Sequence, residues 1–337
     1  MSEDKDSNNY KFGLTSTLRS YENKSYKKGK IRHQDITNTA LEKDLVNLGP
    51  EKTWKKYLKI VEHNLEIVKF TFNHLPPQVV HSQITSNLIP SAALKSFDQK
   101  KMNYELVLEE KEILSLCQEI KEIIEEKKIT VSMHSSQYFS LASDNEEIRK
   151  NSQAELIYYA KVLELISTKA IITIHLNSKQ ELVASLKKEE YFERTAKSVR
   201  NLPPYVLSMI CLGNEPRGFW NSAKLYKFYL YYLNKYGVSF PLVWDNAHEA
   251  ANPSRISSDK ENWEWFISTW KNRTPLFCWS ESCGTNKIAH CDYYHQKGLP
   301  PSSTPIWVCE IKMRELALKE LLESLKINKE EVVWKKD

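Results

Sequence analysis

The chain has 337 residues, of which 41% are hydrophobic and 27% are charged, and its formal net charge is only +5. This composition is typical of a globular protein with a large core, and the small net charge gives no overall field that requires a nucleic-acid partner. No apolar run reaches the roughly 18 residues of a membrane span, and the polar start, MSEDKDSNNYK, does not resemble a signal peptide. We therefore expect a soluble, intracellular protein, and in the absence of any oligomer signal we expect a monomer.

Strand-like and helix-like segments alternate along the chain. Eight short apolar runs predict strands at 11–15, 79–86, 129–134, 170–176, 205–212, 240–245, 275–280 and 305–311. Amphipathic stretches predict helices at 51–75, 108–128, 151–167, 187–200, 222–237, 263–270 and 312–326. Because strands that are apolar on both faces and alternate with helices form parallel sheets, eight such units predict an α/β fold, a single (β/α)8 TIM barrel. A doubly wound open sheet is the alternative, but no G-x-G-x-x-G or G-x-x-x-x-G-K-[ST] motif follows a strand.

The domain organisation is expected to be simple. We expect one domain over residues 11–327, with disordered tails at 1–10 and 328–337, because the sequence shows no internal repeat and no linker rich in proline, glycine and serine. Segment 19–33, RSYENKSYKKGKIRH, is either a solvated lysine-rich loop or an arm that contacts phosphate groups. The six cysteines show no C-x-x-C spacing, which favours buried free thiols in a reducing compartment over zinc binding by cysteine.

Polar residues gather where the predicted strands end. Active sites of such barrels lie at the carboxyl ends of the strands. Four histidines and two carboxylates are expected there, namely His134, His175, Asp245, His248, His290 and Glu310. A single histidine at a strand end is more often a hydrogen-bonded rim residue than a ligand, but six such residues on one edge favour a site for several metal ions. Mixed nitrogen and oxygen donors suit zinc, manganese or iron and hydrolytic chemistry.

Several of these segments together resemble the UV damage endonucleases. HSSQY (134–138) stands where that family has His-Pro-x-Gln-(Phe/Tyr), with Ser135 in place of the proline. AIITIH (170–175) resembles the strand that carries the second metal-binding histidine, and PLVWDNAHEAANP (241–253) is similar to the family's Pro-(Leu/Val)-Val-x-Asp-x-x-His segment. Further segments follow in the family's order, namely 141–166, 268–282, 289–294 and 308–322. The resemblance covers roughly residues 36–325.

The resemblance implies a DNA repair hydrolase that incises the phosphodiester backbone of damaged double-stranded DNA immediately 5′ to a UV photoproduct. Its implied metal ligands are the six residues at the strand ends, with Glu310, Asp245 and His134 also as catalytic residues. Manganese is the expected ion, with magnesium or zinc as alternatives, and the number of ions stays open. Gln137 and Tyr138 would probe the lesion, because glutamine can pair with exposed base edges and tyrosine offers a stacking face.

This sequence departs from the family at two strand ends. The fifth strand ends in Leu212-Gly213-Asn214-Glu215, where the family has Leu-Glu-Asn-Asp with the glutamate as a shared metal ligand. The seventh ends in Phe277-Cys278-Trp279-Ser280-Glu281, where the family has Lys-x-His-x-Ser-Glu, so that Trp279 is expected in place of a histidine ligand. At least one metal position should therefore be lost or weakened. Glu215 is a candidate replacement, because residues i and i+2 of a strand share a face.

Three functions follow from these observations. The first is a metal-dependent endonuclease that acts on UV-damaged DNA. The second is a catalytically impaired homologue that binds distorted DNA without nicking it, which the departures at Gly213 and Trp279 favour. The third is a metal-dependent barrel of the sugar-isomerase type. The Gln137-Tyr138 pair favours DNA over a sugar as substrate.

Overall fold

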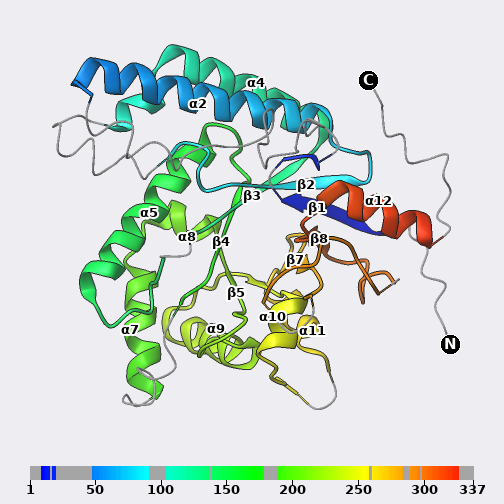
Figure 1. Cartoon of the computed structure of the whole chain (residues 1–337). Helices are drawn as coiled ribbons and strands as arrows, with labels where there is room; N and C mark the ends of the chain where they lie inside the picture. The colour runs from blue at the N-terminus through cyan, green and yellow to red at the C-terminus, as the bar shows by residue number, and fades with distance from the viewer. Residues whose placement is uncertain are drawn as a thin grey trace.

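Eight parallel strands form the centre of the fold. The computed structural model describes residues 9–15, 17–19, 48–90, 104–136, 139–177, 188–257, 260–283, 288–296 and 298–325. The strands are β1 (Lys11–Thr15), β2 (Val79–Ile84), β3 (Thr130–His134), β4 (Ile171–Ile174), β5 (Ile210–Gly213), β6 (Leu242–Val243), β7 (Leu276–Trp279) and β8 (Ile306–Cys309). They pair in the order β6-β5-β4-β3-β2-β1-β8-β7 (Figure 1). The predicted (β/α)8 barrel is confirmed, and each predicted strand segment overlaps one of these strands.

The barrel closes between β6 and β7 through few backbone contacts. Asp245 and Cys278 form an isolated parallel bridge there, and the Cys278 amide donates a hydrogen bond to the carbonyl oxygen of Trp244 at 2.9 Å. Since β6 has only two residues, the junction between these two strands is shorter than the other pairings of the sheet.

Two asparagine side chains extend the sheet at this edge. The amide of Asn214 donates from Nδ2 to Asp245 O at 3.1 Å and accepts at Oδ1 from Asp245 N at 2.7 Å. Asn246 makes the same pair of hydrogen bonds with the backbone of Ser280, both at 2.8 Å. Each side chain therefore satisfies backbone groups that would otherwise lack a strand partner.

Helices surround the sheet (Figure 1). They are α2 (Pro50–Asn73), the 3-10 helix η4 (Tyr104–Glu109), α4 (Lys111–Lys127), α5 (Glu146–Glu164), α7 (Lys188–Arg200), α8 (Pro204–Met209), α9 (Ser222–Tyr236), α10 (Asn246–Ala251), α11 (Asn262–Ser268) and α12 (Arg314–Ser324). Helix α5 begins five residues before its predicted start at 151, because the Asn145 side chain caps it by accepting from the amides of Glu147 and Ile148.

The predicted strand at 205–212 is wrong in its first half. Residues Pro204–Met209 form helix α8, and the strand occupies only Ile210–Gly213. Pro203 precedes the helix and Pro204 stands at its first position, where the fixed φ of proline favours a helical start. A short apolar run has the same hydrophobic pattern in a buried helix as in a buried strand, so the sequence did not separate them.

A buried histidine lies among the first strands of the barrel. His81 is fully buried, with Nδ1 at 2.9 Å from Thr130 Oγ1 and Nε2 at 2.8 Å from Ser132 Oγ. A Cβ atom on Gly13 would lie 2.9 Å from His81 Cδ2, so the glycine in β1 provides the space for this ring. Burial lowers the pKa of His81 to about 3, and the ring is therefore neutral at physiological pH.

The chain ends are described only in part. Tyr10, which belongs to the predicted N-terminal tail, is buried and donates from its hydroxyl to Pro300 O at 3.2 Å. Residues 1–8, 326–337 and the lysine-rich segment beyond Arg19 lie outside the described residues. Among the helices that are described, none is long and apolar enough to span a bilayer.

Candidate metal centre

A pocket of about 440 Å³ lies at the carboxyl end of the barrel. It contains five of the six residues that the sequence predicts there. Its lining consists of Thr15, Arg19, Gln83, His134, His175, His248, His290, Glu310, Ile311, Lys312 and Arg314. The sixth predicted residue, Asp245, is buried beside the pocket with Oδ2 at 3.6 Å from His248 Nδ1. The structure therefore brings all six predicted residues to one end of the barrel.

Three of the histidines lie in a row, with adjacent rings tilted by 47° and 52° to each other. The ring centroids of His134 and His175 are 4.8 Å apart, and those of His175 and His248 are 5.2 Å apart. Each Nδ1 atom faces a backbone carbonyl oxygen: His134 faces Ser135 at 3.0 Å, His175 faces Gly213 at 3.2 Å, and His248 faces Asn214 at 2.8 Å. Because a carbonyl oxygen only accepts, these contacts place the ring proton on Nδ1 and leave the lone pair of Nε2 for a metal ion.

The charge state of His175 also suits a ligand. Burial holds the pKa of His175 well below its usual value, and the neighbouring His134 and His248 lower it further. A metal ion binds the neutral imidazole, so His175 is in the form that ligation requires.

Glu310 supplies negative charge at the centre of the pocket. Its Oε1 accepts from Gln83 Nε2 at 3.2 Å, and its Oε2 lies 3.9 Å from His290 Nε2. Burial alone would raise the pKa of this carboxyl, but the surrounding His134, His290 and His248 hold it below its usual value. Glu310 is therefore ionised at neutral pH, as a ligand of a divalent cation must be.

The donor set fits a divalent metal. Across the described ranges, neither Asp245 nor Glu310 forms an ion pair with a lysine or an arginine, and the basic side chains near them are the imidazoles of His248 and His290. The buried Nδ1 of His290 has no hydrogen-bond partner there. Carboxylates that are buried without a cation are costly, and a dication would offset that cost.

The missing glutamate at position 213 has a steric explanation. A Cβ atom on Gly213 would lie 2.9 Å from Cε1 and 3.3 Å from Nδ1 of His175. The imidazole thus occupies the space that any side chain at this position would need. Gly213 and the observed position of His175 depend on each other.

Glu215 follows β5, and its side chain contacts the backbone that follows β4. It is 4% exposed, and its Oε1 accepts from the Asn177 amide at 2.7 Å. Burial raises the pKa of Glu215 to about 8, although hydrogen bonds from the Asn177 and Leu176 amides act in the opposite direction. Glu215 is absent from the pocket lining, and its role as a replacement ligand stays a prediction.

The residue that β7 directs to the site is Cys278 and not Trp279. The Cys278 thiol donates to Glu310 Oε1 at 3.5 Å, whereas Trp279 packs edge-on against Tyr294 and Trp307 with centroid distances of 6.0 and 5.7 Å. Alternate residues of a strand face opposite sides, so the family's histidine position could have been assigned to Cys278. Burial, Glu310 and Asp245 raise the pKa of the Cys278 thiol well above its usual value.

Cationic side chains also line the pocket, namely Arg19, Lys312 and Arg314, and no sequence motif marks them as a group. Arg19 Nε donates to Lys312 O at 3.0 Å, and Arg314 Nη1 donates to Thr17 O and Oγ1, both at 2.5 Å. Arg19 belongs to the lysine-rich segment 19–33, for which phosphate contacts are one of the two predicted roles. The two predicted lesion probes at 137 and 138 lie outside the described residues.

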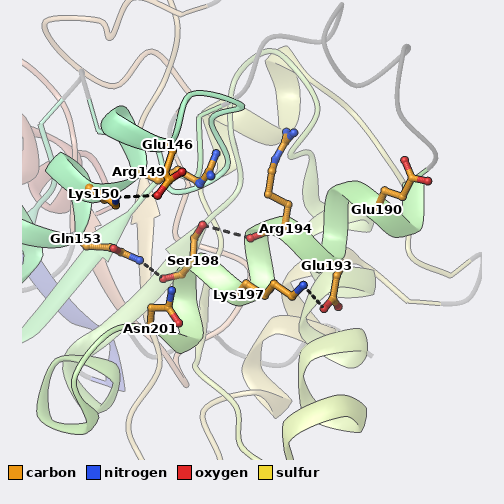
Figure 2. A pocket seen from close by; sticks show the side chains of 10 residues that line it. All are labelled: Glu146, Arg149, Lys150, Gln153, Glu190, Glu193, Arg194, Lys197, Ser198 and Asn201. Atoms are coloured by element: carbon orange, nitrogen blue, oxygen red, sulfur yellow. Dashed lines mark hydrogen bonds and ion pairs between the residues drawn. The ribbon is translucent and has the colours of Figure 1, made fainter.

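A second pocket of about 500 Å³ lies between α5 and α7 (Figure 2). It contains none of the predicted site residues, and its lining is Glu146, Arg149, Lys150, Gln153, Glu190, Glu193, Arg194, Lys197, Ser198 and Asn201. Several of these charges pair with each other, as Lys150 does with Glu146 at 2.8 Å and Lys197 with Glu193 at 3.5 Å. Exposed helix-surface pairs of this kind are not a chemical site.

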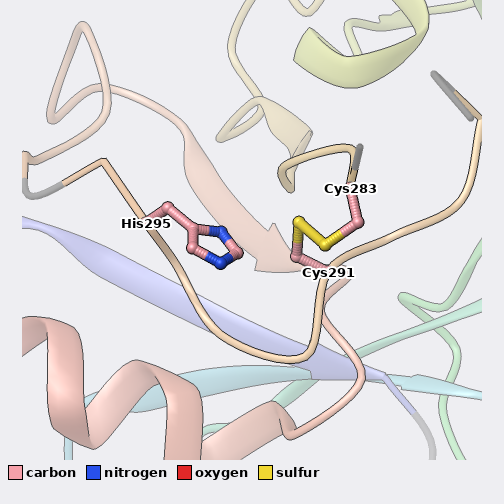
Figure 3. A group of neighbouring side chains, drawn as sticks. All are labelled: Cys283, Cys291 and His295. Atoms are coloured by element: carbon pink, nitrogen blue, oxygen red, sulfur yellow. A yellow bond between two sulfur atoms is a disulfide. The ribbon is translucent and has the colours of Figure 1, made fainter. Parts of the chain in front are cut away.

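A disulfide bond stands next to His290. Cys283 is bonded to Cys291, with His295 beside the pair (Figure 3). An antiparallel bridge between Ser282 and His290 also holds this loop. The expectation of buried free thiols is therefore wrong for these two cysteines, because the pairing of Ser282 with His290 brings their neighbours Cys283 and Cys291 together.

The other four cysteines are free and buried, as expected: Cys117, Cys211, Cys278 and Cys309.

Comparison with known proteins identifies the family. The profile of UvdE, UV-endonuclease, matches residues 11–336. The chain belongs to the UvdE family. A UV DNA damage endonuclease from Halalkalibacterium halodurans is 25% identical over 317 residues, which cover 85% of this chain and 92% of that protein. The resemblance that the sequence motifs predicted is thus confirmed.

Solved structures agree on the fold. The crystal structure of SacUVDE superposes with a TM-score of 0.67 at 22% identity and covers 95% of this chain and all of that one. A 3-keto-D-glucoside 4-epimerase from E. coli, YcjR, gives a TM-score of 0.50 at 10% identity, with 79% of this chain and 94% of that one covered. Since a sugar epimerase shares the barrel, the fold alone does not separate the DNA and sugar hypotheses.

Proposed function

We propose that this UvdE-family protein is a metal-dependent endonuclease that binds UV-damaged double-stranded DNA and incises the phosphodiester backbone immediately 5′ to the photoproduct. The observation that carries the metal-dependent part is the row of three imidazoles at the barrel end. Each has Nδ1 against a backbone carbonyl, which leaves Nε2 for a metal beside Glu310. Family membership supports DNA as the substrate.

The ligands that we propose are the six residues at the strand ends: His134, His175, Asp245, His248, His290 and Glu310. Manganese is the proposed ion, with magnesium or zinc as alternatives, because nitrogen and oxygen donors are mixed in this set. Divalent ions bound there would supply Lewis-acid polarisation of the phosphate and would make a water molecule more acidic.

The protein's own residues have three tasks in this proposal. Arg19, Lys312 and Arg314 line the same pocket and would hold the DNA backbone through charge-assisted contacts to phosphate oxygens. Glu310, whose pKa is held low, would keep its negative charge at the centre of the site. Gln137 and Tyr138, which follow His134 in the chain, would contact the damaged bases and stabilise the distorted duplex.

Incision of supercoiled plasmid tests the proposal. UV-irradiated and untreated plasmid are incubated with the protein in manganese, in magnesium and in chelator. We expect nicking of irradiated plasmid only, in the presence of metal only, and its loss in His134→Ala but not in His63→Ala, an exposed histidine on α2. An end-labelled duplex with one photoproduct maps the cut. Equal nicking of both plasmids, or nicking in chelator, would contradict the proposal.

A catalytically impaired homologue is the second candidate. It is favoured by one observation: the His175 ring fills the space of a side chain at Gly213, so the shared carboxylate that the resemblance implies has no room. Fewer anionic ligands leave metal charge uncompensated. Tight binding to irradiated duplex without nicking, in every metal tested, would favour this function over the nuclease.

A further inference from the structure

We propose that the sulfur of Cys278 is a metal ligand together with Asp245 and Glu310, and that this sulfur directs the position to a zinc-class ion in preference to manganese. This inference depends on one part of the proposed function, namely that a metal ion binds at the carboxyl end of the barrel. The experiment that tests it measures which atoms bind the metal and does not depend on DNA incision.

The three donor atoms already lie together. One carboxylate oxygen each from Asp245 and Glu310 and the Sγ of Cys278 all lie within 4.8 Å of one another. They come from three neighbouring segments at the seam of the barrel, since Asp245 is the bridge partner of Cys278 and the Glu310 amide donates to Trp279 O at 3.0 Å. Backbone hydrogen bonds therefore hold in place the three segments that carry the donors.

Burial and charge call for a cation at this point. Asp245 is 3% exposed and Cys278 is 5% exposed. In the described ranges the carboxylates of Asp245 and Glu310 have no lysine or arginine partner, and the basic side chains within ion-pair distance of them are the imidazoles of His248 and His290. A dication bound between the two carboxylates and the sulfur would supply positive charge to this group and offset the cost of burying it.

The chemistry of sulfur sets the preference. On binding, the Cys278 thiol releases its proton to solvent and a metal–sulfur bond forms, so one proton is lost for each ion bound and no electron is transferred. Thiolate is a soft donor that favours zinc and similar ions, whereas manganese and magnesium favour oxygen donors. A site with one thiolate and two carboxylates should therefore discriminate between these ions.

Another buried cysteine provides a matched control. Cys211 lies in β5, its Sγ contacts Ile172 O at 3.6 Å and Thr173 Oγ1 at 3.4 Å, and it is as buried as Cys278. Its contacts are to a carbonyl and a hydroxyl and not to a carboxylate. Cys211→Ser should thus leave the metal spectrum unchanged.

Spectroscopy of the metal-loaded protein tests the inference. The protein is stripped with chelator and loaded with cobalt for absorption and with zinc for X-ray absorption. We expect a near-ultraviolet sulfur-to-cobalt charge-transfer band and a zinc–sulfur distance of about 2.3 Å. Both should persist in Cys211→Ser and in a Cys283→Ser/Cys291→Ser double variant, and both should be absent from Cys278→Ser. The preference for zinc over manganese in competition should fall at least tenfold in Cys278→Ser.

Each other outcome has a defined meaning. The inference is overturned if the metal–sulfur signal is lost only in the Cys283→Ser/Cys291→Ser variant. It is also overturned if nitrogen and oxygen alone bind the zinc ion in the unsubstituted chain. Should Cys278→Ser fail to fold, the spectrum of the Cys283→Ser/Cys291→Ser variant still decides whether sulfur binds, and Cys278→Asp should bind metal with a preference for manganese. Loss of nicking with the sulfur signal intact would count against the proposed function only.

Discussion

Replacing Gly213 by alanine is expected to destabilise the protein through one contact. The added Cβ would lie 2.9 Å from Cε1 of His175, closer than carbon atoms approach without a shift. His175 is held on its other side by the ring of His134, whose centroid is 4.8 Å away, and by that of His248 at 5.2 Å. The ring therefore cannot move freely, and its contact with Gly213 O would be lost or lengthened.

The size of this effect follows from overpacking. Extra atoms in a well-packed region cost about 1–3 kcal/mol. At about 2 °C for each kcal/mol in a chain of this size, the melting temperature should fall by about 2–6 °C. The measurement is thermal and urea denaturation in chelator, so that metal binding does not contribute.

Gly298→Ala is the control, because a Cβ there meets nothing within 4 Å. Alanine also reduces the entropy of the unfolded chain, so the control should be unchanged or slightly more stable. Equal stability of Gly213→Ala and Gly298→Ala would refute the steric argument. The same contact predicts that Gly213→Glu does not increase the amount of bound manganese, whereas Gly213→Glu in a His175→Ala background has room for the carboxylate.

Three further predictions concern the fold. The pKa of His81 is about 3 in the folded chain and 6.5 in the unfolded chain, so that between these values only the unfolded chain binds the proton. The free energy of unfolding should therefore fall by about 2 kcal/mol from pH 6.5 to pH 5. Urea titrations at the two pH values should show a smaller fall in His81→Asn. The Cys283→Ser/Cys291→Ser variant lacks the disulfide, and its free energy of unfolding without reductant should be about 2.5 kcal/mol lower than that of the unsubstituted protein. A reductant should destabilise the unsubstituted protein by a similar amount and leave the variant unaffected. Glu215→Ala leaves the Asn177 amide without its acceptor, so the free energy of unfolding should fall by about 1–3 kcal/mol while the amount of bound metal stays unchanged. Less bound metal at unchanged stability would instead show that Glu215 is a ligand.

The sequence predicted the barrel because its strands are apolar on both faces and separated by amphipathic helices. It also predicted that polar residues gather at one end of the barrel. His134 ends β3, Asp245 and Glu310 lie just beyond β6 and β8, and parallel pairing brings these strand ends to one edge. The first half of 205–212 was assigned wrongly because a six-residue apolar helix and a strand share a hydrophobic pattern.

Other features depend on contacts that have no sequence pattern. The side of β7 that faces the pocket is fixed by pairing with β8, and this pairing places Cys278 rather than Trp279 against Glu310. Likewise, the disulfide between Cys283 and Cys291 depends on the pairing of Ser282 with His290, for which a spacing of eight residues is no signal. The reason for Gly213 lies in a ring 38 residues earlier in the chain.

The seam between β6 and β7 has a consequence for how the barrel opens. The strands nearest the two ends of the chain, β1 and β8, pair over four residues, and Arg314 adds its contacts to Thr17. The shortest junction lies instead between two internal strands, β6 and β7, at the bridge of Asp245 and Cys278. Transient opening should therefore begin beside β6, without separating the chain termini, and the amide hydrogens there should exchange with solvent before those of β1. An ion held by Asp245 and Cys278 would join both sides of this junction, so that its arrival should slow the exchange and its loss should loosen the barrel.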